Sequence, residues 1–230
     1  MKPGYESFVG AHRLALRYGL TAGELGYYYI DYLKLKLDYQ VVRMEGYRDA
    51  MLWPETGQLW NRPSPSIHSF ETILCYNGGC FFEATNVSEG RGTAAPFQIY
   101  GAPYIELDPF IKELRNRIHN EHLAIRPRAF TPFWSKHAGR VCFGVEFLPL
   151  DNRLDFLTDA LITMKTIKDM YPEDFAFTKY ADVSGLASLS GDKTADLYLE
   201  GRMSLTEMKE QWEAEADAFR KETEVYKIYR

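Results

Sequence analysis

The densest group of hydrogen-bonding side chains in this 230-residue sequence lies in residues 81–93, which read FFEATNVSEGRGT. The window contains two carboxylates, those of Glu83 and Glu89. Most glycoside hydrolases use a pair of carboxylic acids, one acting as the acid and the other as base or nucleophile. Glu83 and Glu89 are therefore candidate catalytic residues of a glycosidase.

A guanidinium lies between two glycines in the same window. Arg91 can present its planar fork to a carboxylate or a phosphate through two parallel hydrogen bonds. Gly90 and Gly92 permit backbone conformations closed to other residues and allow a ligand or another strand to approach closely. Three further polar side chains could orient sugar hydroxyls or an acetamido group: Asn86, Ser88 and Thr93. The window thus has the composition of a substrate-binding loop.

Other roles for the same residues stay open on residue chemistry alone. An internal ion pair between a glutamate and Arg91 could pin a buried loop, with Asn86 and Ser88 closing an Asx-type turn. A phosphate cradle is a weaker alternative, because the sequence lacks GxGxxG and GxxxxGK[ST] and the carboxylates would repel phosphate. A divalent-metal site is disfavoured because no second acidic cluster is visible to complete its ligand shell.

Composition places the chain among globular proteins and argues against two kinds of partner. A hydrophobic fraction of 46% can fill a core, and the aromatic fraction of 15% is high enough to line a pocket for sugars, bases or peptides. The formal net charge of -5 argues against nucleic-acid binding, which usually needs a basic surface. No apolar run of roughly 18 residues could span a membrane, and MKPGYESFVG lacks the apolar core of a signal peptide.

Cysteine and histidine usage predicts neither a disulfide framework nor a metal site. Cys75, Cys80 and Cys142 are odd in number and show no CxxC spacing, so we expect buried thiols. The histidines show no HExxH pattern, and His119 and His122 are expected to form a solvated pair near a helix end. We therefore expect no metal and no cofactor.

The first part of the chain predicts a helix, a strand and a long loop. Thr21 and Glu24 have the spacing of a capping box, so a helix should cover residues 21–33 and Glu24 should be a cap rather than a catalyst. The β-branched run at 39–44 predicts a strand. Residues 53–65 are rich in Pro, Gly and Trp and predict a linker or an active-site loop.

The rest of the chain alternates predicted helices and strands. Helices are predicted at residues 66–76, 107–119, 154–167 and from the capping box Ser204-Leu205-Thr206-Glu207 onward. Strands are predicted at residues 80–82, 96–100, 130–133 and 140–148, the last two joined as a hairpin through residues 135–139. The fold class is therefore mixed α/β or α+β, without an internal repeat.

Several segments resemble one known family, the exo-β-N-acetylmuramidases of the NamZ type. The matching segments, in order, are residues 17–25, 63–67, 82–93, 96–97, 101–104, 130–132 and 135–136. The resemblance runs over nearly the whole chain, and SEGRGT is its most specific segment. Smaller departures are Tyr18, Tyr47 and Ala84, where the family usually has His, Trp and Gly.

The resemblance implies a hydrolase that removes N-acetylmuramic acid from the non-reducing ends of peptidoglycan fragments, in cell-wall turnover and recycling. It implies a Rossmann-like N-terminal domain, an α/β C-terminal domain and an active site in the cleft between them. Residues 1–62 then correspond to the end of the first domain, most of which is missing, and residues 63–230 to the second. The family's presumed catalytic glutamate would lie in the missing part, so no residue of this chain inherits it.

The resemblance also implies roles for the residues of the window. Arg91 would bind the lactyl carboxylate of N-acetylmuramic acid, and Glu83 or Glu89 would be the second carboxylate or a positioning group. Ring substituents would be held by Asn86, Ser88 and Thr93.

Two alternatives from other classes accompany this hypothesis. One is a non-catalytic muropeptide-binding or interaction module. The other is a truncated chain whose exposed seam, including the helix at 21–33, drives association into an oligomer. Relatives are often periplasmic or secreted, and any export signal would lie upstream of Met1, so the sequence leaves the compartment open.

Overall fold

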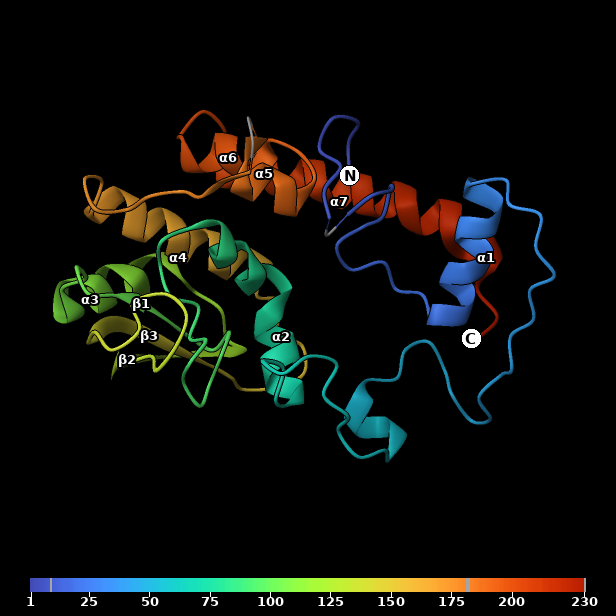
Figure 1. The fold of residues 1–230 in the computed structure, drawn as a ribbon, viewed down its shortest axis with the longest axis horizontal. Coiled ribbons are helices and arrows are strands. Elements are labelled where there is room, and N and C mark those ends of the chain that lie inside the picture. Colours follow the sequence, from blue (N-terminus) through green and yellow to red (C-terminus); the bar gives the residue numbers. More distant parts are fainter. Residues whose placement is uncertain (9, 181–182, 230) are drawn as a thin grey trace. The chain divides into compact units, whose positions relative to one another are not determined.

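The structure is a computed structural model that describes residues 1–8, 10–180 and 183–229 (Figure 1). The chain divides into two compact units. The first contains Met1–Arg13 and Trp60–Met208, and the second contains Leu14–Leu59 and Lys209–Arg230. Helices and a small antiparallel sheet together confirm the predicted mixed α/β class. The Rossmann-like character of the first 62 residues stays a prediction.

A three-stranded antiparallel sheet lies at the centre of the first unit. Strands β1 (Ile99–Ala102), β2 (Leu123–Phe130) and β3 (Cys142–Pro149) have the order β1-β3-β2. The register pairs Leu123 with Pro149 and Phe130 with Cys142, so a hairpin is present and its second strand lies where it was predicted, but its first strand precedes the predicted one. A separate pair of short strands, β4 (Lys179–Tyr180) and β5 (Val183–Ser184), completes the strands of the described residues.

Two strands near the predicted site differ from the prediction. The strand predicted at 130–133 is wrong except for Phe130, because the first hairpin strand covers residues 123–130 and includes Pro127, which an edge strand tolerates. The strand predicted at 96–100 begins only at Ile99, because Phe97 has φ 60, in the left-handed region that a strand cannot contain.

Helices of the first unit pack on the sheet and on one another. Helix α3 (Leu107–Arg117) contacts β2 and β3, and α2 (Phe70–Gly79) contacts β3. Helix α4 (Leu157–Met170) contacts both α2 and α3 and ends before Pro172, as the sequence predicts. Two short helices follow, α5 (Gly185–Ser190) and α6 (Thr194–Leu199). Apolar side chains from these elements form the core, among them Phe110, Leu114, Phe147, Leu161 and Met164.

The strand predicted at residues 80–82 is wrong, because these residues form the 3₁₀ helix η2 (Cys80–Ala84). Gly78, with φ 97, turns the chain at the end of α2, and the hydroxyl and N–H of Thr85 both donate to the carbonyl of Phe82. The apolar run is buried as expected, but a short buried run does not distinguish a strand from a helical turn.

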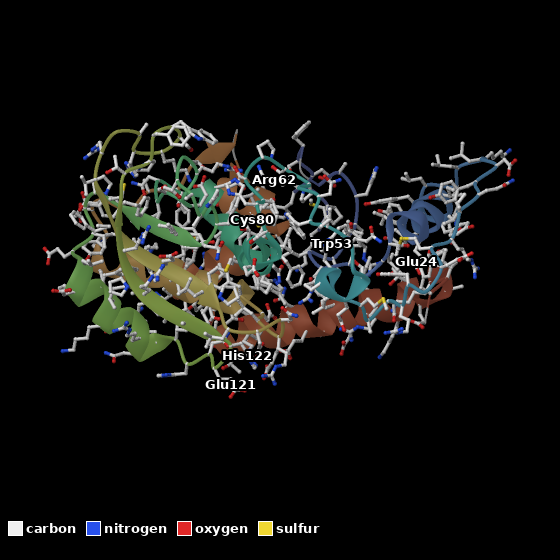
Figure 2. The ribbon with its side chains drawn as sticks, turned by 90° about the horizontal axis from the view of Figure 1, so that it is seen from below. Glu24, Trp53, Arg62, Cys80, Glu121 and His122 are labelled. Carbon is white, nitrogen blue, oxygen red and sulfur yellow. The ribbon has the colours of Figure 1, made fainter. Side chains whose placement is uncertain are left out.

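The three thiols are free and buried, as predicted. Cys80, labelled in Figure 2, directly follows α2. Burial raises the pKa of the Cys80 thiol to about 12 and that of the Cys142 thiol to about 11, and it raises the pKa of Cys75 further still. A thiol with so high a pKa carries almost no thiolate at neutral pH, which suits a structural role.

Helix α1 (Ala22–Tyr32) and helix α7 (Leu205–Thr223) both begin at the capping boxes that the sequence predicts. The Thr21 hydroxyl accepts the N–H of Glu24, and the Ser204 hydroxyl accepts the N–H of Glu207. Within the second unit, Tyr28 of α1 packs edge-on against Phe219 of α7, with their ring centroids 5.7 Å apart. Two 3₁₀ helices, η1 (Trp53–Thr56) and η3 (Glu224–Tyr226), complete this unit.

The strand predicted at residues 39–44 is wrong, because this stretch has no regular secondary structure. A strand needs a partner for its backbone groups, and the second unit contains no strand among its described residues. Side chains replace that partner in part. The Tyr39 hydroxyl donates to the carbonyl of Gly23, and the N–H of Met44 donates to the hydroxyl of Tyr229.

Glu24, labelled in Figure 2, is a buried cap whose carboxylate bonds to both segments of the second unit. One carboxylate oxygen accepts the N–H and hydroxyl of Thr21, and the other accepts the N–H groups of Ile228 and Tyr229. Burial by itself would raise the pKa of Glu24, but these hydrogen bonds outweigh it and lower the pKa below 4.5. The structural role expected for Glu24 is therefore confirmed.

Glu24→Gln should destabilise the chain by about 2 kcal/mol at neutral pH, because the charged acceptor of these hydrogen bonds is lost. The folded-state pKa is lowered, so the stabilisation by the carboxylate is present above pH 4.5 and is lost as the pH falls through the folded pKa. The difference in unfolding free energy between wild type and Glu24→Gln should therefore shrink below pH 4.5. Urea denaturation followed by tyrosine fluorescence from pH 7 to pH 3 measures it.

Glu207→Gln is the matched control, because Glu207 fills the same position of a capping box but is exposed, and among the described residues its carboxylate bonds to Ser204 alone. Its effect should be clearly smaller than that of Glu24→Gln. Equal effects of the two variants would show that the contacts of Glu24 with the chain end contribute nothing.

Candidate active site

The polar window, residues 81–93, begins in η2 with Glu83 and continues as a loop that is fixed on both sides. The loop follows η2 and leads into β1, and Ser88 and Gly101 exchange backbone hydrogen bonds in both directions. On the other side, the N–H of Asn86 donates to the carbonyl of Ala176, and the N–H of Thr178 donates to the carbonyl of Ala84. The loop is thus held between the central sheet and residues 174–178.

Arg91 brings the two predicted carboxylates together. Its Nη1 lies 3.0 Å from Glu83 Oε2 and 3.0 Å from Glu89 Oε1. Its guanidinium also stacks over the Phe97 ring, with Cζ 5.0 Å from the ring centroid. The two glutamates therefore approach one nitrogen from two directions, which is the internal ion pair of the alternative interpretation.

The two carboxylates differ sharply in access to solvent. The Glu89 side chain is 1% exposed, whereas those of Glu83 and Arg91 are 29% and 27% exposed. Burial acts to lower the pKa of Arg91, but its hydrogen bonds and charge interactions with Glu83 and Glu89 outweigh burial and raise the pKa. Arg91 is thus a fixed cation that, with Glu83, forms the accessible part of the cluster.

Lys136 is the residue of the cluster to which sequence reasoning gave no role. Its ammonium lies 2.8 Å from Glu89 Oε2 and also donates to the carbonyls of Phe82 and Val87, at 2.8 and 3.1 Å. Both oxygens of Glu89 are therefore paired with a cation. The Ser135-Lys136 match was the available signal, but a contact 47 residues along the chain from Glu89 cannot be read from spacing.

Asn86 connects the loop to two neighbouring segments through every polar atom of its amide. Its Nδ2 donates to the carbonyl of Asp174, and its Oδ1 accepts the Tyr104 hydroxyl and the N–H of Ala176. Its backbone carbonyl also lies 2.7 Å from His137 Nε2. These contacts give Asn86 a structural role, and its predicted contact with a sugar ring stays a prediction.

Ser88 and Thr93 stabilise turns within the loop itself. The buried Ser88 hydroxyl accepts the N–H of Gly90, and the Thr93 hydroxyl donates to the carbonyl of Gly90 and accepts the N–H of Ala95. Such side chain to backbone bonds are typical of Ser and Thr in turns. Their predicted role in binding ring substituents also stays a prediction.

The two glycines beside Arg91 serve close backbone approach as well as conformation. Gly90 and Gly92 both have φ +79, in the left-handed region. A Cβ on Gly92 would lie 2.4 Å from the carbonyl oxygen of Trp134, and one on Gly90 would lie 2.8 Å from that of Ile99. The glycines therefore let the turn that carries Arg91 lie directly against two other backbone segments.

The two histidines that were expected to form a pair lie in different surroundings. His119 is exposed, whereas the half-buried His122 pairs with Asp151, with Nδ1 3.0 Å from Oδ2, next to the start of β2 (Figure 2).

Within residues 1–8, 10–180 and 183–229, no group of three potential ligands has the arrangement of a metal site. Over the same residues, no helix combines the length and apolarity needed to cross a bilayer.

Two family models match the chain. The model of the C-terminal part of the exo-β-N-acetylmuramidase NamZ matches residues 74–229, and the model of its N-terminal part matches residues 1–71. The peptidoglycan β-N-acetylmuramidase NamZ of Bacillus subtilis (strain 168) is 33% identical over 230 residues. That match covers 100% of this chain and 55% of the relative, so the chain spans about half the relative's length.

Two solved structures share the fold of the chain. Both are crystal structures of DUF1343 family proteins from Bacteroides fragilis NCTC 9343. One superimposes with a TM-score of 0.85 at 25% sequence identity, and the other with a TM-score of 0.70 at 24% identity. Each match covers 100% of this chain and 61% of the other.

Lys136→Met should destabilise the chain by about 3 kcal/mol, because it leaves one oxygen of the buried Glu89 carboxylate without its cation. Lys112→Met, at an exposed position on α3, is the control and should have little effect. Urea denaturation measures both. A Lys136→Met chain as stable as wild type would show that Arg91 alone compensates Glu89.

Gly92→Ala should destabilise the chain by about 2 kcal/mol more than Gly139→Ala. Both glycines have a left-handed φ, but a Cβ on Gly139 meets nothing within 4 Å, whereas one on Gly92 meets the Trp134 backbone. The difference isolates the close approach from the conformational strain. Equal melting temperatures for the two variants would contradict the contact between the Arg91 turn and the loop at Trp134.

Proposed function

The chain belongs to the exo-β-N-acetylmuramidase family NamZ, and we propose on that premise that it acts in the exo-lytic release of N-acetylmuramic acid from peptidoglycan fragments. In this proposal the sugar is removed from the non-reducing end of the peptidoglycan fragment, and the reaction serves cell-wall turnover and recycling. The name of the Bacillus subtilis relative, a peptidoglycan β-N-acetylmuramidase, supports the proposal. The observation that carries it at the site is the partly exposed pair of Arg91 and Glu83.

Arg91 is proposed to bind the carboxylate that distinguishes N-acetylmuramic acid from N-acetylglucosamine. A guanidinium carries five N–H donors, and the ion pairs of Arg91 with Glu83 and Glu89 are both closest at the same nitrogen, Nη1. The stack on Phe97 and the bonds to two glutamates fix the guanidinium before a ligand arrives. A preorganised cation loses little freedom on binding, which favours recognition of an anionic sugar.

The two glutamates are proposed to act differently. Glu83 reaches solvent and would be the carboxylate that contacts the substrate, as the second carboxylate of the reaction or as a group that orients it. Glu89 is buried between two cations and would position Arg91. Contacts to ring substituents are proposed for Asn86, Ser88 and Thr93.

The domain assignment is part of the same proposal. Residues 1–62 are proposed to be the end of a Rossmann-like N-terminal domain, and residues 63–230 to form the α/β C-terminal domain. The change from one family model to the other between residues 71 and 74 supports a boundary in this region. One boundary of the compact units, between residues 59 and 60, lies close to the same place, but the units group Met1–Arg13 with the second proposed domain and Lys209–Arg230 with the first.

A hydrolysis assay of the purified chain on a synthetic N-acetylmuramic acid glycoside tests the function, together with a thermal-shift titration with N-acetylmuramic acid. We expect the sugar to raise the melting temperature, and cleavage would place the chemistry within these residues. A shift without cleavage would support the alternative, a muropeptide-binding module. If the sugar produces no shift and the glycoside is not cleaved, the proposal for this chain is overturned.

Arg91→Ala should weaken N-acetylmuramic acid binding about tenfold while changing N-acetylglucosamine binding much less, because a charge-assisted bond to the carboxylate is lost. The ratio of the two affinities, measured by calorimetry, is the readout, since a general loss of structure would lower both. Arg91→Lys should retain part of the preference, and Arg202→Ala, at an exposed arginine in the turn between α6 and α7, should retain all of it. An unchanged ratio in Arg91→Ala would show that Arg91 does not read the lactyl group.

A further inference from the structure

Two large aromatic side chains project from the loop between β2 and β3. Phe133 is 79% exposed and Trp134 is 47% exposed, and their ring centroids lie 6.5 Å apart. Burial of such side chains is among the strongest contributions to folding. An adjacent pair left in solvent is therefore a feature that stability does not explain.

The backbone that carries this aromatic pair is held firmly. The N–H of Phe133 donates to the carbonyl of Gly92, and the N–H of Gly139 donates to the carbonyl of Pro132. Lys136 and His137 anchor the same loop to the polar window through Phe82, Val87, Glu89 and Asn86. The pair is thus presented on a fixed support rather than on a free loop.

Part of this support is strained. Ser135 and His137 have φ values of 73 and 57, in the left-handed region that residues other than glycine rarely adopt. Such a conformation is unfavourable and persists only where the surroundings impose it. The loop turns sharply on both sides of Lys136, which lets the ammonium point toward Glu89 while Phe133 and Trp134 remain outside.

The aromatic pair borders the accessible part of the candidate site. Gly92, whose Cα lies against the Trp134 backbone, is the residue next to Arg91. Tyr76 is a third partly exposed ring near the cluster, packed edge-on against Phe97 with centroids 4.8 Å apart. Burial raises the pKa of Tyr76, and the charges of Cys80 and Glu83 raise it further.

Charged groups bordered by exposed rings match the two kinds of surface on a sugar. A pyranose ring has an edge of hydroxyls and an apolar face of C–H groups, and the C–H face packs on the negative face of an aromatic ring. We propose that Phe133 and Trp134 form a platform for a pyranose ring of the same glycan whose carboxylate binds Arg91. This inference rests on the proposed function and adds residues that set affinity for the glycan.

Calorimetric titration of the full chain with a disaccharide carrying N-acetylmuramic acid at its non-reducing end tests the platform. Trp134→Ala and Phe133→Ala should each weaken binding about tenfold, and Trp134→Phe by less than about threefold because a ring is retained. Leu150→Ala, at an exposed apolar side chain just after β3 and so at the opposite end of the hairpin, is the control and should bind as wild type does. The preference for muramyl over glucosaminyl ligands should persist in Trp134→Ala, since Arg91 is unchanged.

The possible outcomes separate the platform from the proposed function. If Trp134→Ala and Phe133→Ala remain folded and bind the disaccharide like wild type, the platform is wrong and the muramidase function stands. If wild type binds only N-acetylglucosamine oligomers, and Trp134→Ala weakens that binding, the platform stands and the muramyl function falls. If wild type binds neither the disaccharide nor N-acetylglucosamine oligomers, the platform and the proposed function are both wrong.

Sedimentation velocity supplies the last comparison, because exposed aromatic side chains also serve contacts between proteins. A wild-type dimer that Trp134→Ala converts to a monomer, with sugar affinity unchanged, would identify a protein contact and overturn the platform.

Discussion

The buried carboxylate of Glu89 is the constraint on which the candidate site depends. A charge removed from water is tolerated only when it is paired and hydrogen-bonded, and Glu89 has a cation at each oxygen. Each of these cations is held by something else as well, Arg91 by Glu83 and Phe97, and Lys136 by two backbone carbonyls. One buried charge therefore fixes the turn around Arg91 and the hairpin loop in a single arrangement.

This arrangement explains why so many polar groups gather in one short stretch. Most of them compensate backbone groups that the loop leaves without a ladder, as Asn86 does for residues 174–176 and Thr93 does for Gly90. Arg91 and Glu83 remain partly open to solvent. The structural and functional interpretations of the window are therefore compatible, since the internal ion pair holds in place the side chains that a ligand can reach.

Local signals in the sequence were sufficient wherever neighbouring residues determine the structure. The capping boxes at Thr21 and Ser204, the stop before Pro172 and the second strand of the hairpin were all predicted. The sequence failed where a distant partner decides. Residues 39–44 have strand composition but no strand to pair with in their unit, and residues 80–82 were buried by turns rather than by a ladder. No role was predicted for Lys136 for the same reason, because its partners are far away in the sequence.

Long-range contacts also have a consequence for the order in which the chain folds. The hairpin of β2 and β3 closes locally, but the window needs partners 47 residues away at Lys136 and 88 and 90 residues away at Asp174 and Ala176. Contacts of large sequence separation form only after the entropy of closing long loops has been overcome. The contacts of Asn86 should therefore form late in folding, after synthesis has passed residue 176, so that a nascent chain can have its sheet and its ion cluster before the loop that carries them is fixed on both sides.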